Sequence, residues 1–219
     1  MNTHLHLMEA ITTYYRATGH ELARSRLLEL IVVLSNSVVR KNAGACTDKY
    51  QRDWSPLAGD DRVSYGHDLE NIWLLVEACD VTGLSHALLL DLYRTLFDST
   101  LSHGVDHRAG GVYAGGALGK PADRCEKIWW VQAEALVSAL QMHSLTGEAS
   151  YFKAFKQILD WIVKRQADWE CGDWHARIGT NGKPHGDKAH AWKGPYHNGR
   201  AMLKCLELLP ATRQAPAGS

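Results

Sequence analysis

Residues able to move protons recur at nearly regular intervals along the 219-residue chain. His6, His67, Trp130 and His197 are separated by 61, 63 and 67 residues. A neutral imidazole can accept a proton near pH 7. Two histidines on opposite sides of a pocket can therefore remove a proton from one face of a carbon atom and return it to the other. The spacing and the residue types favour acid–base chemistry on a small molecule.

Charged side chains accompany the three histidines. A helix would place a residue three positions later on the same face as each histidine, and these residues are Glu9, Glu70 and Arg200. The positive end of a helix dipole favours a neutral imidazole, whereas a neighbouring carboxylate orients the ring and favours its charged form. The pattern predicts a pocket in which Glu9, beside His6, also contributes to binding.

Other residues near these positions suit an uncharged ligand rich in hydroxyl groups. The rings of Trp130, Trp192 and Tyr196 can stack on a sugar, and its hydroxyls can be bound by polar side chains, namely Glu70, Lys193, Asn198 and Arg200. The chain carries 24 basic and 24 acidic residues. This balance argues against nucleic acid or an anionic membrane as partner, and favours a small carbohydrate.

Helical periodicity dominates the chain, and we expect an all-α fold. The predicted helices cover 3–17, 20–40, 67–82, 85–102, 126–146, 148–166 and 198–209. A Thr-Gly pair recurs at residues 18–19, 82–83 and 146–147, at intervals of 64 residues. Glycine commonly ends a helix, so each pair predicts a tight turn between two helices. Ser85 is a candidate N-cap.

Helical hairpins that repeat in this way form a toroid or a solenoid. The long connections, 41–66, 103–125 and 167–197, would all lie at one end, and their length suggests a functional role. Equivalent positions converge on the axis of a toroid, so the four recurring residues should surround one pocket under these loops. Short hairpins of strands are compatible with the loops.

Several residues have simpler interpretations. Most other histidines fit capping or surface positions: His20, His86, His103, His107, His143 and His175. Trp73 and Trp161 fit the core, and Asp60 and Asp61 fit a solvated turn. The glycine-rich segment 110–119 lacks the features of a phosphate-binding loop. His4 and His6 diverge on a helix, so we expect neither a metal nor a cofactor.

The five cysteines are widely spaced and form no C-x-x-C pair, which favours a reducing, cytoplasmic location. The N-terminus lacks the pattern of a signal peptide. The longest strongly apolar stretch, 27–34, is too short to cross a membrane. We expect one domain over residues 1–209 and a flexible tail over 210–219.

Longer motifs resemble a known family. The segments NTHLHLMEA, SYGHDLENIWLLVEA, KIWWVQAEALVSAL, LTGEASYF and DKAHAWKGPYHNGRA resemble the N-acylglucosamine 2-epimerase superfamily, and within it most closely the cellobiose 2-epimerases. The resemblance runs from residue 1 to about 209. It implies an (α/α)6 barrel and sugar epimerisation without metal or nucleotide.

The resemblance also implies roles for individual residues. His197 would be the base at C2 of the reducing-end glucose, and His67 would assist ring opening and act as the opposite acid or base. The substrate site would be lined by His6, Glu70, Trp130 and Trp192. The implied path runs through ring opening, a cis-enediolate, rotation about C2–C3 and reprotonation from the other face.

The chain departs from the family in length. Members are roughly twice as long, with twelve barrel helices, whereas this chain resembles the C-terminal half and shows about seven. The missing part includes an arginine that holds the substrate. An incomplete barrel would expose the inner faces of its helices and leave an apolar groove. A homodimer, a separately encoded N-terminal half, and a truncated, inactive product all remain open.

Other functions also remain open. An aldose–ketose isomerase, such as one converting mannose to fructose, would protonate the same enediolate at C1, and an N-acylglucosamine 2-epimerase would take an acylated sugar. A non-catalytic carbohydrate-binding or interaction module would bind without turnover. A glycoside hydrolase would need a carboxylate pair, for which Glu70 and Asp187 are the candidates.

Overall fold

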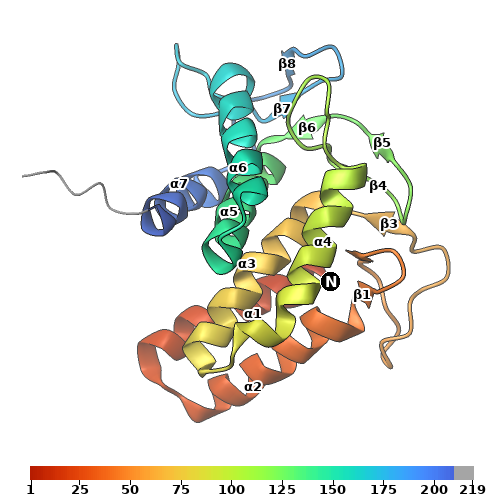
Figure 1. Ribbon diagram of the computed structural model, residues 1–219, viewed down its shortest axis with the longest axis vertical. Coiled ribbons are helices and arrows are strands. Elements are labelled where there is room, and N and C mark those ends of the chain that lie inside the picture. Colours follow the sequence, from red (N-terminus) through yellow and green to blue (C-terminus); the bar gives the residue numbers. More distant parts are fainter. Residues whose placement is uncertain (210–219) are drawn as a thin grey trace, which may run out of the picture.

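The computed structural model describes residues 1–209, and seven α-helices form its framework (Figure 1). They are α1 (Asn2–Thr18), α2 (Glu21–Val32), α3 (Tyr65–Thr82), α4 (Leu90–His103), α5 (Trp129–Thr146), α6 (Ala149–Trp161) and α7 (Tyr196–Leu208). The all-α prediction, with about seven helices, is confirmed. The predicted tail, 210–219, lies outside the described residues.

The Thr-Gly pairs join α1 to α2, α3 to α4 and α5 to α6. Gly19, Gly83 and Gly147 each follow the last residue of a helix, with φ angles of 63°, 74° and 71°. This left-handed conformation is accessible to glycine at little cost, which explains why each turn ends on it. Helix α3 packs against α1 and α5, and α5 also packs against α7, so α1, α3, α5 and α7 form one row. Helices α2, α4 and α6 pack against this row (Figure 1).

Some helix ends differ from the predictions because long-range contacts compete with local propensity. The predicted helix 20–40 ends α-helically at Val32 and continues as one π-helical segment, Val33–Ser37. The predicted helix 148–166 ends in the same way, with Ile162–Gln166. Ser85 precedes a 3-10 turn, His86–Leu89, but its side chain makes no capping hydrogen bond. Helix α5 begins three residues late, at Trp129, because Lys127–Ile128 pair with a strand.

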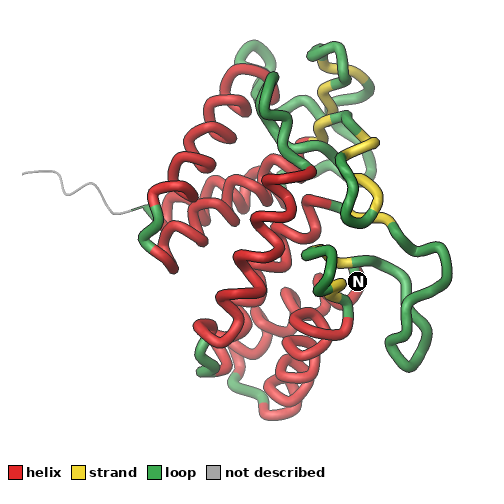
Figure 2. The backbone as a smooth tube through the Cα atoms, turned by 45° about the vertical axis from the view of Figure 1, so that its right-hand side comes forward, coloured by secondary structure: helices red, strands yellow, loops and turns green. Residues whose placement is uncertain are grey.

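Three small antiparallel sheets organise the long connections (Figure 2). The first contains β1 (Val39–Arg40) and β2 (Ala45–Cys46). The second has the order β3 (Arg62–Val63), β4 (Gly115–Ala117) and β5 (Ala122–Arg124), and the third has the order β6 (Lys127–Ile128), β7 (Arg177–Ile178) and β8 (Pro184–His185). Because β3–β4 and β6–β7 each join two successive connections, they fix the loops around the first turns of α3 and α5.

The core lies where α3 and α5 pass between their neighbours. Trp73 and Trp161 are 2% and 6% exposed, as predicted for core residues. Trp161 also explains part of the glycine-rich segment, because a Cβ at Gly110 or Gly111 would lie within 3 Å of its ring. No helix of residues 1–209 is both long and apolar enough to cross a membrane.

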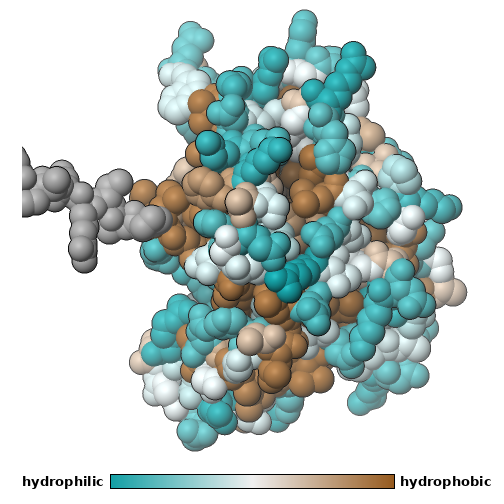
Figure 3. Space-filling model, viewed as in Figure 1, coloured by the Kyte–Doolittle hydropathy of each residue, from teal (hydrophilic) through white to brown (hydrophobic). Residues whose placement is uncertain are grey.

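The row of inner helices is bridged by charged side chains as well as by apolar ones. Glu77 of α3 forms ion pairs with Arg16 of α1 and Lys204 of α7. Exposed leucines lie on the far side of α7, where Leu203 and Leu206 are 65% and 71% exposed, and Figure 3 shows hydrophobic surface over this helix. The expected exposure of apolar surface is therefore found on α7, while polar bridges cross between the helices.

Asp68, in the first turn of α3, makes stability depend on pH. Its side chain is 1% exposed and accepts a hydrogen bond from the Cys46 amide over 2.9 Å. Burial raises the pKa of Asp68 to about 7, whereas an unfolded aspartate titrates at about 4. The stabilisation from this proton is complete below about pH 4 and is lost as the pH rises through about 7.

We predict that Asp68→Asn, which keeps the acceptor but cannot ionise, removes this component. Between about pH 4 and 7 the free energy of unfolding of the unmodified chain should fall relative to the variant by on the order of 3 kcal/mol. Urea titrations followed by circular dichroism at several pH values measure it. Parallel pH curves for the two chains would contradict the assignment.

Candidate active site

The first turns of the inner helices surround a cavity of about 520 Å³, within the range of roughly 300–1,000 Å³ typical of small-molecule sites. Its wall is formed by Asn2, His6, Glu9, His67, Trp129, Trp130, Trp192, Tyr196 and His197. The four recurring residues of the sequence are thus brought together, one from each of α1, α3, α5 and α7. Asn2 and Trp129 also line the cavity, and neither carried a signal that set it apart in the sequence.

Trp130 lies between the two candidate catalytic histidines. Its ring centroid is 4.8 Å from that of His67 and 5.5 Å from that of His197, with 36° between the planes in both cases. Gly66 permits this arrangement, because a Cβ at this position would lie 2.2 Å from the Trp130 ring. The three side chains form an aromatic wall with an imidazole on each side.

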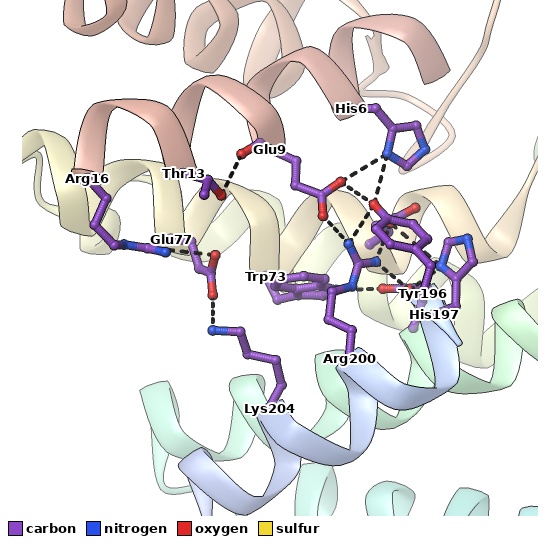
Figure 4. A network of polar contacts seen from close by, with 12 residues as sticks. His6, Glu9, Thr13, Arg16, Trp73, Glu77, Tyr196, His197, Arg200 and Lys204 are labelled. Atoms are coloured by element: carbon purple, nitrogen blue, oxygen red, sulfur yellow. Dashed lines mark hydrogen bonds and ion pairs between the residues drawn. The ribbon is translucent and has the colours of Figure 1, made fainter. Parts of the chain in front are cut away.

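Beneath this wall, Arg200 connects all four inner helices (Figure 4). Its Nη2 donates to Glu70 over 2.7 Å and to Glu134 over 2.8 Å. Its Nη1 donates to Glu9 and, over 2.7 Å, to the Tyr196 hydroxyl. The guanidinium is therefore shared by carboxylates from α1, α3 and α5, rather than being free to bind a hydroxyl.

Glu134 is the important residue that the sequence predictions missed. Its Oε1 lies 2.7 Å from Nδ1 of His197, and its Oε2 accepts a hydrogen bond from the Trp73 indole over 2.8 Å. A carboxylate at Nδ1 favours the tautomer with the proton on that nitrogen, which leaves Nε2 as the basic atom. The repeat contains the missed signal, because Glu134 follows Glu70 by the same 64 residues that separate the Thr-Gly pairs.

The two buried glutamates differ in charge. Burial, together with the negative charge of Glu134, raises the pKa of Glu70 well above its ordinary value. Burial acts on Glu134 in the same direction. The hydrogen bond from His197 and the positive charge of Arg200 outweigh it and lower the pKa of Glu134. Glu134 is therefore the ionised partner of His197, and Glu70 is the group that holds a proton.

His6 belongs to a second group at the rim of the cavity. Its Nδ1 lies 3.1 Å from Glu9 Oε2 and 3.3 Å from the Tyr196 hydroxyl, which itself donates to Glu9. Burial raises the pKa of Glu9, but the hydrogen bonds from His6, Tyr196 and Arg200 and the charge of Arg200 lower it to about 2. Glu9 is consequently a permanent anion that positions its three neighbours.

Lys193 and Asn198 have other contacts than those expected. The Lys193 side chain is fully buried, and its Nζ lies 2.6 Å from Asp173 Oδ2. Asn198 donates to Asp173 Oδ1 over 2.7 Å. Both residues tie the 167–195 loop to α7 and do not line the cavity. The same loop carries Trp192, which is 87% exposed at the cavity rim.

Two groups of side chains have the composition of metal ligands, His6–Glu9–Glu70 and Glu70–Glu134–His197. In each group the donor atoms lie within 4.8 Å of one another. Glu9, Glu70 and Glu134 already pair with Arg200. A metal ion would have to displace this guanidinium, so the donor set fits an internal cation better than a metal centre.

The paired inner and outer helices, with a site at the loop end of the inner ones, define a protein of the (α/α)6-barrel type. Residues 1–201 match the family model of N-acylglucosamine 2-epimerase. The chain belongs to this family.

Two curated relatives show the range of the family. A cellobiose 2-epimerase of Ruminococcus albus is 33% identical over 95% of this chain and 53% of its own length. A D-mannose isomerase of Marinomonas mediterranea is 24% identical over 95% of this chain and 55% of its own length. The solved cellobiose 2-epimerase of Bacillus thermoamylovorans B4167 superimposes with a TM-score of 0.87 at 30% identity, covering 95% of this chain and 53% of that one. The chain thus spans about half the length of these relatives.

We predict that adding one methyl group at Gly66 displaces Trp130. Gly66→Ala should lower the free energy of unfolding by roughly 1–3 kcal/mol, because the ring must move. Gly199→Ala, in α7, is the matched control, since its Cβ would meet only Pro195 at 3.6 Å. Helix propensity alone should then stabilise the control by up to about 1 kcal/mol. Urea titrations with tryptophan fluorescence compare them, and equal effects would contradict the packing.

His67 should stay neutral over the physiological range. Burial, only partly opposed by the negative charge of Asp48, lowers the pKa of His67 to about 4. Proton–nitrogen correlation spectra, assigned with a His67→Gln variant, should show a neutral ring at every pH above about 5. A midpoint near the ordinary value of about 6.5 would contradict this environment.

Proposed function

We propose that residues 1–209 form the catalytic arc of a sugar 2-epimerase, which interconverts glucose and mannose at the reducing end of a cellobiose-type disaccharide. The observation that carries the proposal is the arrangement of two imidazoles on either side of Trp130, one of them hydrogen-bonded to an ionised carboxylate. Family membership and the similarity to cellobiose 2-epimerases support it.

In the proposed mechanism the open-chain sugar binds against Trp130. His197 removes the C2 proton with Nε2, and the electron pair moves to the carbonyl to give a cis-enediolate. Glu134 holds the Nδ1 proton and stabilises the imidazolium that forms, as a carboxylate does in other acid–base sites. After rotation about C2–C3, a proton returns to C2 on the opposite face through His67. His197 and His67 exchange these roles in the reverse reaction.

The remaining predicted residues have supporting roles in this proposal. His6, Glu9 and Tyr196 bind hydroxyls at the rim, and Trp192 covers a sugar ring at the mouth. Arg200 and Glu70 fix the position of Glu134, while Lys193 and Asn198 hold the loop that carries Trp192. The proposal requires no metal and no cofactor. The free state of all five cysteines supports a cytoplasmic location.

An aldose–ketose isomerase is the second candidate, favoured by the D-mannose isomerase among the relatives. It uses the same enediolate and delivers the proton to C1. An N-acylglucosamine 2-epimerase differs in the sugar, and a binding module differs in having no turnover. A homodimer or an N-terminal half remains a proposal for completing the barrel. A hydrolase is disfavoured, because Glu70 is fully buried and paired with Arg200.

The test is incubation with cellobiose in heavy water, followed by nuclear magnetic resonance. We expect deuterium at C2 and a mannose-ended product. His197→Asn should reduce C2 exchange by roughly 10²–10⁴-fold, the usual contribution of a general base. Glu134→Gln should lower kcat by roughly tenfold or more with little change in KM, because the amide cannot stabilise the imidazolium.

His143→Asn is the matched control, since His143 lies in the last turn of α5 with its Nδ1 3.0 Å from the Glu148 carbonyl oxygen. It should exchange deuterium at the unmodified rate. Fructose-ended product would favour the isomerase, and sugar binding that survives His197→Asn without any turnover would favour the binding module. No deuterium at C2 with the unmodified chain would contradict catalysis by these residues alone.

A further inference from the structure

A second cavity, of about 630 Å³, lies beside the reaction cavity. It is formed by the start of α1 and the 48–57 segment, and Asn2 lines both cavities. The two are also linked electrostatically, because the charge of Asp48, which lines the second cavity, acts on His67 in the first. None of the proposed catalytic steps uses this second cavity.

Aromatic rings gather on the wall of the second cavity. The Trp54 ring centroid lies 4.9 Å from that of His4, with the rings edge to face, and 5.9 Å from that of Tyr50. Tyr50 is fixed from behind, because its hydroxyl donates to the Val38 carbonyl over 2.8 Å and contacts Thr47 over 2.7 Å. The group presents a rigid aromatic surface beside the site.

The backbone holds Trp54 in an unfavourable conformation. Its φ of 67° lies in the left-handed region, which bulky residues rarely adopt. Hydrogen bonds enforce the turn, from Trp54 N to the Gln51 carbonyl, from Gln51 N to the Ser55 carbonyl, and from Ser55 N to the Asp53 carboxylate. Glycine would satisfy the same turn at lower cost. Strain of this kind concentrates at ligand sites, which makes the indole itself the functional feature.

Polar side chains complete the wall. Lys49, Gln51 and Arg52 line the cavity and are exposed, and Asp48 supplies a negative charge beside them. Burial lowers the pKa of His4, as does the positive charge of the N-terminus, so its ring is neutral and can both donate and accept. An aromatic surface flanked by donors and acceptors of both charges suits an uncharged, hydroxyl-rich ring, not an anion.

We propose that the cavity at Trp54 is a saccharide subsite, which binds a sugar ring beyond the one that reacts between His67 and His197. The inference rests on the proposed function, because it takes the reacting ring to occupy the neighbouring cavity. It makes the substrate class an oligosaccharide rather than a free monosaccharide. A chain of β-linked glucose units would run past Asn2 from one cavity to the other.

The test is calorimetric titration with glucose, cellobiose and cellotriose. Trp54→Asn removes the aromatic surface, and asparagine tolerates the left-handed turn. We expect it to weaken binding of cellobiose or cellotriose roughly tenfold, as loss of an aromatic contact would, and to leave glucose unchanged. Trp54→Phe should recover most of the loss. The shortest sugar affected identifies which ring occupies the subsite.

Trp169→Ala is the matched control, since this residue is 77% exposed and lies outside both cavities. It should leave all three affinities unchanged. Equal weakening of glucose and the longer sugars by Trp54→Asn, or no weakening of any, would overturn the subsite. Failure of the proposed function looks different, because the unmodified chain would then bind cellotriose in a Trp54-dependent way but exchange no deuterium at C2.

Discussion

The guanidinium of Arg200 is the interaction on which the site depends. It pairs with Glu9, Glu70 and Glu134, each from a different helix, and stacks over Trp73 at 4.7 Å and Tyr196 at 4.2 Å. Buried carboxylates without a cation would be costly, and the cation would be equally costly alone. The network is therefore satisfied only when all four inner helices occupy their observed positions.

This network also connects the fold to the chemistry. By sharing its charge with Glu134, Arg200 helps to keep that carboxylate ionised, and Glu134 in turn orients His197. Glu70 has the same cation as partner but keeps a proton, because two buried carboxylates beside one guanidinium cannot both ionise cheaply. The small sheets hold the loops around this arrangement, and Gly66 lets Trp130 approach closely enough to separate the histidines.

The 64-residue repeat made much of this predictable. Glycines that end helices identify themselves through their conformational freedom, so the hairpins and the convergence of His6, His67, Trp130 and His197 followed from spacing alone. The partners of Lys193 and Asn198 did not, because Asp173 lies in an irregular loop whose path depends on long-range strand pairing. Glu134 was within reach of the repeat but was hidden in a helix that reads as uniformly apolar. The left-handed conformation of Trp54 leaves no mark in the sequence.

The account places a proton donor and a proton acceptor on opposite faces of one carbon atom. A crystal structure of the chain with cellobiitol, the open-chain reduced form of cellobiose, tests this placement most directly. The account predicts that C2 of the alditol lies against Trp130, with His197 Nε2 on one face and His67 on the other, and that the glucose ring extends away from the two histidines. An alditol bound with both histidines on the same face of C2, or bound away from Trp130, would contradict it.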